Sequence, residues 1–349
     1  MKLFVPGRLC LFGEHSDWSG GYRRINPDLG VGYTLLVGTN QGLYADVTPH
    51  ADSLVMEVSL DDGTQKSFEV KMHPELLLEA AQAGDFFSYA AGVAYRIHRD
   101  FPVGGLKINN YHTDLPIKKG LSSSAAICVL VARAWNLAYN LQLGIREEME
   151  YAYLGEITTG SQCGRMDQGC AYGNVPIAML FDGDRVTIEE LQVGKNLYFV
   201  VVDLAASKDT QKILADLNAC YPVAQNQIHR DVQNYLGNIS YQITKNAIAA
   251  LQAGDGQTLG ELMRYAQTEF DRYMVPASPQ QLTAPILHQL LDYKPIQTYI
   301  WGGKGVGSQG DGTVQFIVKS DVEQLQVMDI IKRDFPHMHP FKLTIYARD

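Results

Sequence analysis

The stretch that decides the fold has the sequence KKGLSSSAA and covers residues 118–126. An apolar, helix-forming run over residues 125–137 follows directly, so the stretch is expected to open into a helix N-terminus. The first amides of a helix have no intrahelical acceptor, and the helix dipole leaves partial positive charge at that end. A glycine allows a tight turn, and three consecutive hydroxyl groups add hydrogen-bond donors. With the two lysines, these groups predict an anion-binding loop whose natural ligand is a polyphosphate.

A second interpretation of the serines is a simple cap on a buried helix. One serine is enough for that purpose, because a cap needs a single side-chain oxygen. A Walker A loop is excluded, since the pattern G-x-x-x-x-G-K-[ST] does not occur in the sequence.

The composition is typical of a globular protein with a sizeable core. The chain has 349 residues, of which 46% are hydrophobic and 19% are charged. This length predicts two domains, which we place at residues 1–190 and 191–349. The net charge of −9 argues against nucleic acid or an anionic membrane as a partner.

The cysteines and the apolar runs indicate a cytoplasmic location. The five cysteines form no C-x-x-C pair, and an odd count in a chain of this length is typical of reduced thiols. The apolar residues before Pro6 are too few for a signal-peptide core. The longest unbroken apolar run, residues 125–132, is far too short to span a membrane.

Polar residues gather directly after an apolar segment near the N-terminus. Glu14, His15 and Asp17 follow that segment within four positions, and Gly20 and Gly21 close the stretch. Carboxylates and an imidazole can accept hydrogen bonds from hydroxyl groups, so the cluster suits a polyhydroxy ligand. A polar turn between two strands is the structural alternative.

Two further carboxylates follow the serine loop. Glu156 lies near the end of a helix expected over residues 146–159, among apolar and small neighbours, although a helical glutamate usually faces solvent. Asp167 lies in the sequence GRMDQG, residues 164–169, before a strand. Neither carboxylate alone indicates a function. Each becomes informative only together with the other motifs.

A glycine-rich stretch near the C-terminus resembles a dinucleotide-binding fingerprint. Residues 305–310, GVGSQG, match G-x-G-x-x-G. That fingerprint requires a helix directly after the last glycine. The sequence TVQFIV at residues 313–318 predicts a strand instead. A hairpin whose backbone allows close approach of another segment or a ligand fits better.

The three separated motifs resemble those of the GHMP kinases, the family of galactokinases, homoserine kinases, mevalonate kinases and phosphomevalonate kinases. The stretch from Pro6 to Gly21 and the sequence MDQ at residues 166–168 are most similar to galactokinases. The resemblance implies an α+β, two-lobed fold, with an N-terminal ribosomal-protein-S5-like lobe and a C-terminal ferredoxin-like lobe. It further implies that the N-terminal domain binds nucleotide and carries catalysis, while the C-terminal domain completes the active site.

The resemblance also implies a role for each matched residue. Asp167 would be the base or orienting group at the acceptor hydroxyl, and Arg8 would lie beside it and keep it ionised. Ser124 and Glu156 would hold Mg²⁺. The nucleotide phosphates of ATP would be bound by Lys118, Lys119, Gly120, Leu121, Ser122, Ser123, Ser124 and Ala125. The substrate pocket would be lined by Glu14, His15, Asp17, Gly20, Gly21, Arg165, Gly303 and Gly305.

The sequence departs from galactokinases at several positions. Lys118 and Lys119 stand where galactokinases usually have glycines, and Arg165 replaces an apolar residue beside the aspartate. Arg23 and Arg24 lie in a short additional stretch after the glycine pair. One of these three arginines would bind a carboxylate or phosphate of the substrate, because guanidinium suits such groups. The alternative is that Arg165 pairs with a local carboxylate and that Arg23 and Arg24 lie on a solvated turn.

We therefore expect ATP-dependent phosphorylation of a small sugar at the anomeric hydroxyl. The alternatives are a GHMP kinase for a non-sugar alcohol such as mevalonate and a catalytically silent sugar-binding regulator. A silent regulator would be expected to lack Asp167, Glu156 or the serine loop, and the sequence retains all three.

Overall fold

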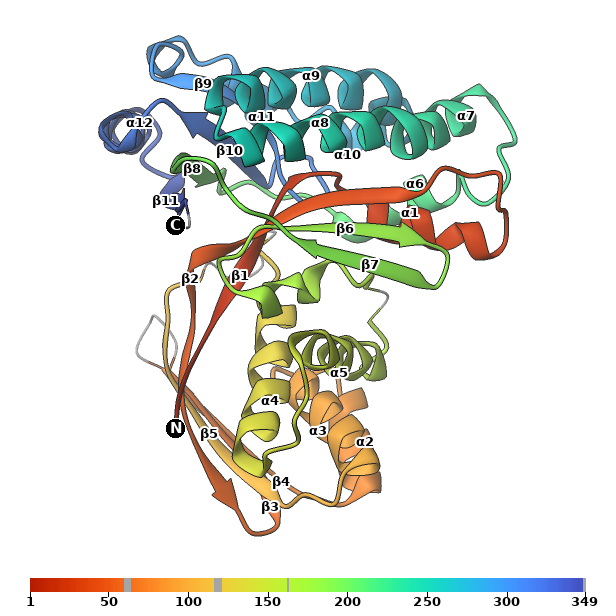
Figure 1. Ribbon diagram of the computed structural model, residues 1–349, viewed down its shortest axis with the longest axis vertical. Helices are drawn as coiled ribbons and strands as arrows, with labels where there is room; N and C mark the ends of the chain where they lie inside the picture. The colour runs from red at the N-terminus through yellow and green to blue at the C-terminus, as the bar shows by residue number, and fades with distance from the viewer. Residues whose placement is uncertain (60–63, 116–120, 162, 348–349) are drawn as a thin grey trace. The chain divides into compact units, whose positions relative to one another are not determined.

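The computed structural model describes residues 1–59, 64–115, 121–161 and 163–347 (Figure 1). The chain forms two compact units that are not continuous in sequence. Unit 1 contains residues 1–8 and 38–174, and unit 2 contains residues 9–37 and 175–349. Two long strands, β1 (Lys2–Phe12) and β2 (Gly32–His50), each contribute residues to both units. The units thus differ from the division at residue 190, which stays a prediction about functional domains.

Unit 1 places a helical layer against a mixed sheet. Strand β5 (Gly105–Thr113) lies between β2, which it pairs antiparallel through residues 43–50, and β3 (Ser53–Ser59), which it pairs parallel. Strand β4 (Gln65–Lys71) pairs antiparallel with β3. The helices lie on one side of these strands (Figure 1); they are α2 (Pro74–Gln82), α3 (Ser88–Asp100), α4 (Ser123–Tyr139), α5 (Ile145–Thr158) and the 3₁₀ helix η2 (Asp167–Tyr172).

Helix α4 is the core of unit 1. Its apolar residues are buried almost all round, including Trp135 with no exposed surface, so its stability comes from packing against α3, α5 and η2. The N-terminal end of this helix is the point at which the serine loop ends.

Unit 2 contains a four-stranded antiparallel sheet in the order β11-β8-β10-β9. Its strands are β8 (Leu197–Asp203), β9 (Ile300–Gly305), β10 (Thr313–Val318) and β11 (His339–Ile345). Helices connect β8 to β9, and α12 (Asp321–Asp334) connects β10 to β11. This order is the split β-α-β arrangement of ferredoxin-like folds. A buried apolar cluster that includes Val200, Phe316 and Ile331 joins the sheet to α12.

The helices between β8 and β9 form the rest of unit 2. They are α6 (Thr210–Asn218), α7 (Gln227–Asn234), the π-helical turn η3 (Tyr235–Ile239), α8 (Ser240–Ala253), α9 (Gly256–Met274), η4 (Val275–Ala277), α10 (Pro279–Leu282), α11 (Pro285–Leu291) and η5 (Lys294–Ile296). The hairpin of β6 (Ile177–Asp182) and β7 (Arg185–Glu190) pairs with residues 32–36 of β2.

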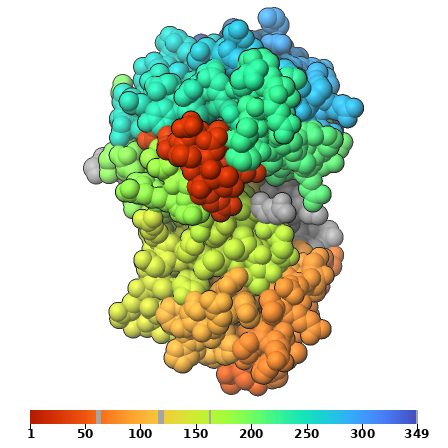
Figure 2. Space-filling view, turned by 90° about the vertical axis from the view of Figure 1, so that its right-hand side faces the viewer, coloured from red at the N-terminus to blue at the C-terminus, as the bar shows by residue number. Residues whose placement is uncertain are grey.

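The N-terminal part of unit 2 packs against these helices. It contains α1 (Ser16–Gly21) and the 3₁₀ turn η1 (Tyr22–Arg24). Figure 2 shows this segment in red against the green surface of residues that follow β8. The hydroxyl of Tyr22 donates to Asn218 Oδ1 at 3.0 Å, and its ring stacks on Tyr221 with centroids 5.2 Å apart. These contacts fix the segment that carries the predicted substrate residues.

The observed strands are longer than the sequence pattern predicts. The apolar residues 3–5, followed by Pro6 and Gly7, predict a strand that ends there, whereas β1 continues to Phe12. The same pattern predicts two separate strands over residues 33–37 and 43–47, whereas β2 is continuous. Gly38 interrupts the apolar pattern, but a Cβ there would lie 2.0 Å from the carbonyl oxygen of Gly173, so this glycine permits close packing rather than a turn. No helix among the described residues is long and apolar enough to cross a membrane.

Candidate functional site

In unit 1, strand β1 brings Arg8 to the predicted catalytic aspartate. The Arg8 Nη2 group donates to Asp167 Oδ1, and the arginine side chain is buried. The Arg8 amide also donates to the carbonyl oxygen of Leu121 at 3.0 Å, which ties β1 to the serine loop. Gly7 makes this approach possible, since a Cβ at residue 7 would lie 2.9 Å from the same oxygen. A charge-assisted contact of this kind holds the carboxylate in one orientation.

The serine loop enters α4 through an unusual backbone conformation. Ser122 has φ 57° and ψ 48°, the left-handed region, and its side chain makes no capping hydrogen bond. This differs from the simple cap considered as an alternative, in which a serine hydroxyl satisfies a helix amide. Leu121 and Ala125 are buried, and Ser122, Ser123 and Ser124 are partly exposed. Lys118, Lys119 and Gly120 lie outside the described residues.

Glu156 faces the interior of unit 1 and not solvent. Only 3% of its surface is exposed, and its Oε2 accepts a hydrogen bond from Gln168 Nε2 at 2.7 Å. Burial is the main cause that raises the pKa of Glu156 to about 7, and the nearby charge of Asp167 raises it further. A hydrogen bond with Ser124 acts in the opposite direction. The two predicted metal ligands and the predicted catalytic aspartate are therefore neighbours.

This group of oxygens fits Mg²⁺. Magnesium prefers hard oxygen ligands and usually takes only one or two from the protein, with phosphates and waters completing the shell. Glu156 and Ser124 supply a carboxylate and a hydroxyl in contact with each other, and a cation would relieve the repulsion between Glu156 and Asp167. Among the described residues no cluster of three or more His, Cys, Asp or Glu side chains could hold a metal alone.

In unit 2, Glu14 forms a buried ion pair that the sequence did not predict. Lys304 Nζ donates to Glu14 Oε1 and to the carbonyl oxygen of Gly305, the latter at 2.8 Å. Glu14 is 6% exposed and Lys304 is 2% exposed, so the pair is removed from water. Burying one of these charges alone would be costly, because ions lose their hydration in the interior.

His15 lies beside this pair in a constrained conformation. It precedes α1 with φ 67°, a region that residues other than glycine rarely adopt. Its Nδ1 accepts a hydrogen bond from Trp18 Nε1 at 3.2 Å. Burial lowers the pKa of His15 to about 4, with smaller contributions from Lys208 and Lys304. The imidazole is thus neutral at pH 7, and Asp17 follows it, partly exposed, in the first turn of α1.

Three of the four predicted substrate glycines, Gly20, Gly303 and Gly305, occupy tightly packed backbone. A Cβ at Gly20 would lie 2.6 Å from the carbonyl oxygen of Phe181, whereas Gly21 has open space. Gly303 and Gly305 lie in strand β9 and not in the loop that follows. A Cβ at Gly303 would strike the Phe316 ring at 2.4 Å, so this glycine is explained by packing.

The three arginines considered for substrate binding all contact protein groups. Arg165 makes two hydrogen bonds of 3.0 Å with the carboxylate of Glu150, and its guanidinium carbon lies 4.1 Å from the Tyr153 ring centroid. Arg23 Nε donates to Asp182 Oδ1 at 2.5 Å. Arg24 Nη1 lies 3.6 Å from Asp184 Oδ1, with both side chains well exposed. The alternative describes such a pair for Arg165 only. Arg23 and Arg24, which it places on a solvated turn, also lie beside carboxylates.

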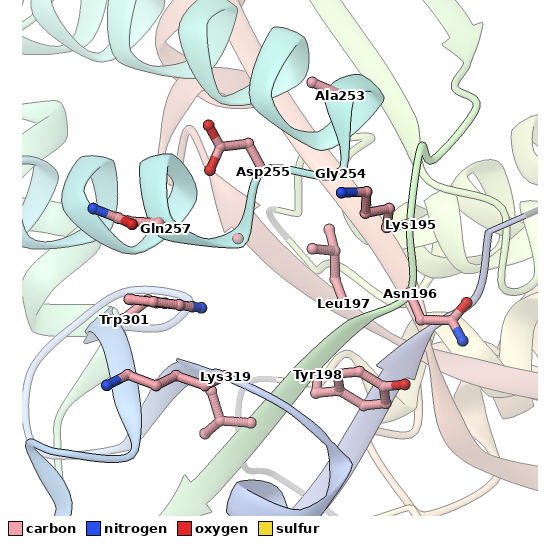
Figure 3. Close-up of a pocket in the computed structure, with 12 residues that line it drawn as sticks. Lys195, Asn196, Leu197, Tyr198, Ala253, Gly254, Asp255, Gln257, Trp301 and Lys319 are labelled. Carbon is pink, nitrogen blue, oxygen red and sulfur yellow. The ribbon is translucent and has the colours of Figure 1, made fainter.

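A surface pocket in unit 2 contains none of the predicted residues. It has a volume of about 540 Å³ and lies where β8 and β9 begin, at the end of the sheet opposite the glycine loop (Figure 3). The polar groups around it already serve the fold: Asp255 caps α9 by accepting from the Thr258 amide at 3.0 Å, and Lys319 Nζ donates to the Thr298 carbonyl oxygen at 2.6 Å. We therefore do not assign the reaction to this pocket.

Comparisons with known proteins agree with the fold and with the serine loop. Residues 88–174 match the model of the GHMP kinases N terminal domain. The galactokinase of Thermococcus kodakarensis is 26% identical over 288 residues, which cover 75% of this chain and 75% of the relative. The galactokinase of Roseiflexus sp. is 25% identical over 356 residues, or 91% of this chain and 84% of the relative.

Solved structures show the same fold along almost the whole chain. Lactococcus lactis galactokinase complexed with galactose has a TM-score of 0.73 at 17% identity, covering 99% of this chain and 93% of that one. Methanococcus jannaschii mevalonate kinase has a TM-score of 0.73 at 17% identity, covering 100% and 98%. The α+β fold expected from the motifs is confirmed.

Fold and sequence together define a kinase that transfers a phosphoryl group to an alcohol, in the class of sugar and alcohol kinases. The resemblance to the GHMP kinases is confirmed: residues 88–174 match the N-terminal domain of these kinases, and galactokinases are among the curated relatives.

Proposed function

We propose that the protein transfers the γ-phosphoryl group of ATP to a small sugar, at the anomeric hydroxyl. The observation that carries this proposal is the group formed by Asp167, Arg8 and Glu156 in unit 1. About a quarter of the residues are identical to those of galactokinases over most of the chain. This similarity supports a sugar as the acceptor.

Asp167 would orient the acceptor hydroxyl and accept its proton. An aspartate that accepts a hydrogen bond from a buried arginine has a fixed position, and phosphoryl transfer depends mainly on positioning and on neutralisation of charge. The fixed carboxylate would then hold the hydroxyl oxygen in line with the phosphorus atom. Arg8 would act through Asp167 by holding its carboxylate group in place.

The serine loop and the helix behind it would bind the nucleotide phosphates. The amides at the start of α4 have no intrahelical acceptors and present partial positive charge. Ser124 and Glu156 would hold Mg²⁺, and the bound ion would neutralise charge on the phosphates. The same loop would include Lys118, Lys119 and Gly120, which would also bind the nucleotide phosphates.

The acceptor would be bound by the polar residues at the start of α1. Glu14 is an ionised acceptor held by Lys304, and His15 is a neutral imidazole whose orientation Trp18 fixes. Such fixed groups suit the hydroxyls of a sugar, each of which can donate and accept. Asp17 is a further candidate acceptor.

An ADP-release screen over neutral sugars, uronic acids, sugar phosphates, polyols and mevalonate tests the function. We expect ATP-dependent turnover of at least one sugar and loss of its reducing end in the product, since phosphorylation at the anomeric hydroxyl blocks ring opening. Turnover of mevalonate without turnover of any sugar would favour the non-sugar alternative. The Asp167→Asn variant serves as the control for contaminating kinases.

A further inference from the structure

Lys208 lies in the segment between β8 and α6, close to the proposed acceptor residues of unit 2. Its Nζ donates to the carbonyl oxygen of Gln309 at 2.9 Å. Within the described residues Lys208 forms no ion pair; its side chain is partly exposed, and desolvation of the ammonium group lowers its pKa. Buried charges are usually paired, because an isolated ion in the interior is costly.

The glycine loop after β9 is shaped around this lysine. A Cβ at Gly312 would lie 2.6 Å from Lys208 Cε, and one at Gly310 would lie 3.5 Å from Lys208 Cβ. Gln309, whose carbonyl receives the lysine, has φ 63° and is only 2% exposed. Gly312, two residues beyond the G-x-G-x-x-G stretch, therefore leaves room for the lysine side chain beside the loop.

The charged groups around Lys208 do not balance. Glu14 is the carboxylate that favours the charged form of Lys208, and it is already paired with Lys304. The positive charges of both lysines lower the pKa of His15, whose imidazole is neutral. Burial lowers the pKa of Lys208 to about 8, as expected for a cation without a sufficient counter-ion. The group thus holds two ammonium ions and one carboxylate.

His15 provides a second group that lacks a partner. Its Nε2 nitrogen is buried, and the imidazole lies near the backbone of Ser308, but Nε2 makes no well-formed hydrogen bond. With Nδ1 accepting from Trp18, the neutral ring carries its proton on Nε2 and can donate it. A donor without an acceptor, close to a cation without a counter-ion of its own, indicates an anionic ligand.

We propose that Lys208 binds a carboxylate or phosphate group carried by the acceptor, so that the preferred substrate is an anionic sugar. This inference rests on the proposed function, because it assumes that Glu14 and His15 contact the acceptor. The anionic group of the substrate is thus assigned to Lys208 and not to an arginine. The three arginines considered earlier already pair with carboxylates: Arg23 with Asp182, Arg24 with Asp184, and Arg165 with Glu150.

The test compares kcat/KM for galactose, galacturonate and galactose 6-phosphate in the wild type and in Lys208→Met. We expect the wild type to prefer at least one anionic sugar. Loss of a charge-assisted hydrogen bond should lower kcat/KM for that sugar about 10- to 100-fold in the variant and that for galactose less than about threefold. Lys208→Arg should retain most of the preference. Lys212→Met, four residues along the chain, is the matched control, since Lys212 is exposed and pairs with Asp216.

The outcomes separate this inference from the proposed function. Turnover of neutral sugars alone, with no turnover of or inhibition by either anionic sugar, overturns the inference and leaves a sugar kinase. Equal losses of kcat/KM on all sugars with a raised KM for ATP would assign Lys208 to nucleotide binding. Equal losses with a lowered melting temperature would make Lys208 a structural residue. Either outcome overturns the inference. Turnover of mevalonate, itself a carboxylate, but of no sugar would overturn the sugar kinase. In that case the same Lys208→Met loss on mevalonate would sustain the anion site.

Discussion

Glu14 and Lys304 are 290 positions apart in the sequence, yet Lys304 Nζ donates directly to Glu14 Oε1 in the interior of unit 2. The pair joins the segment before α1 to strand β9, and Gln267 of helix α9 contacts the neighbouring Gly305 amide at 2.8 Å. Two parts of unit 2 from opposite ends of the chain are thus connected at the proposed acceptor residues.

Removal of Lys304 should destabilise the protein strongly. In Lys304→Met the carboxylate of Glu14 loses its buried partner, which should lower the free energy of unfolding by about 3–5 kcal/mol. The double variant Glu14→Gln/Lys304→Met should lose less than Lys304→Met alone, because no buried charge is left. Urea unfolding of all three proteins provides the comparison. A loss below about 1 kcal/mol in Lys304→Met would be inconsistent with a buried pair.

His15 should make stability fall in mild acid. Burial lowers its pKa from the ordinary value of 6.5 to about 4, so the unfolded chain binds a proton first as pH decreases. The neutral imidazole of His15 contributes about 3 kcal/mol to the free energy of unfolding. This contribution is complete above pH 6.5 and is lost progressively down to about pH 4. Denaturant unfolding between pH 7 and 4 should show a smaller pH dependence in His15→Gln. The exposed His73→Gln is the control, and an unchanged slope in His15→Gln would contradict the assignment.

Ser124 and Glu156 should act through one metal ion. Ser124→Ala and Glu156→Ala should each raise the Mg²⁺ concentration that gives half-maximal activity. Because both are proposed to bind the same ion, their effects should be strongly non-additive in a double-mutant cycle. Activity titrations with Mg²⁺ measure this, and losses that simply multiply at saturating Mg²⁺ would rule out a shared ion.

Arg165 should behave as a structural residue. Its contacts with Glu150 and Tyr153 are partly exposed, and exposed ion pairs contribute about 0–1 kcal/mol. Arg165→Met should therefore change the melting temperature slightly and affect neutral and acidic sugars equally. Melting curves and kcat/KM for galactose and galacturonate test this. A loss confined to the acidic sugar would return Arg165 to the substrate pocket.

The sequence predicted the local parts of the candidate site well. The serine loop does precede a buried helix, and the G-x-G-x-x-G stretch is followed by strand β10, so rejection of a dinucleotide fold was correct. Each of these features depends on neighbouring residues, which a sequence pattern displays directly.

Contacts between distant segments could not be read from the pattern. Gln168 stands beside Asp167, but its contact with Glu156 depends on how η2 packs against α5. Lys208 has no motif around it, and its role becomes visible only where the glycine loop accommodates it. The contact of Arg165 with Glu150 is likewise not marked by any motif, because it depends on how the segment before η2 lies against α5.

The most direct test of the account is the Asp167→Asn variant. Asparagine keeps the size of the side chain but cannot accept the proton of the acceptor hydroxyl, so turnover should fall about 10²- to 10⁴-fold. Nucleotide binding should remain nearly unchanged, because the serine loop is not altered. Turnover and ATP affinity are measured on the same preparation, with the melting temperature as a control for folding. Turnover within about threefold of the wild type would contradict the assignment of Asp167 as the residue that handles the proton.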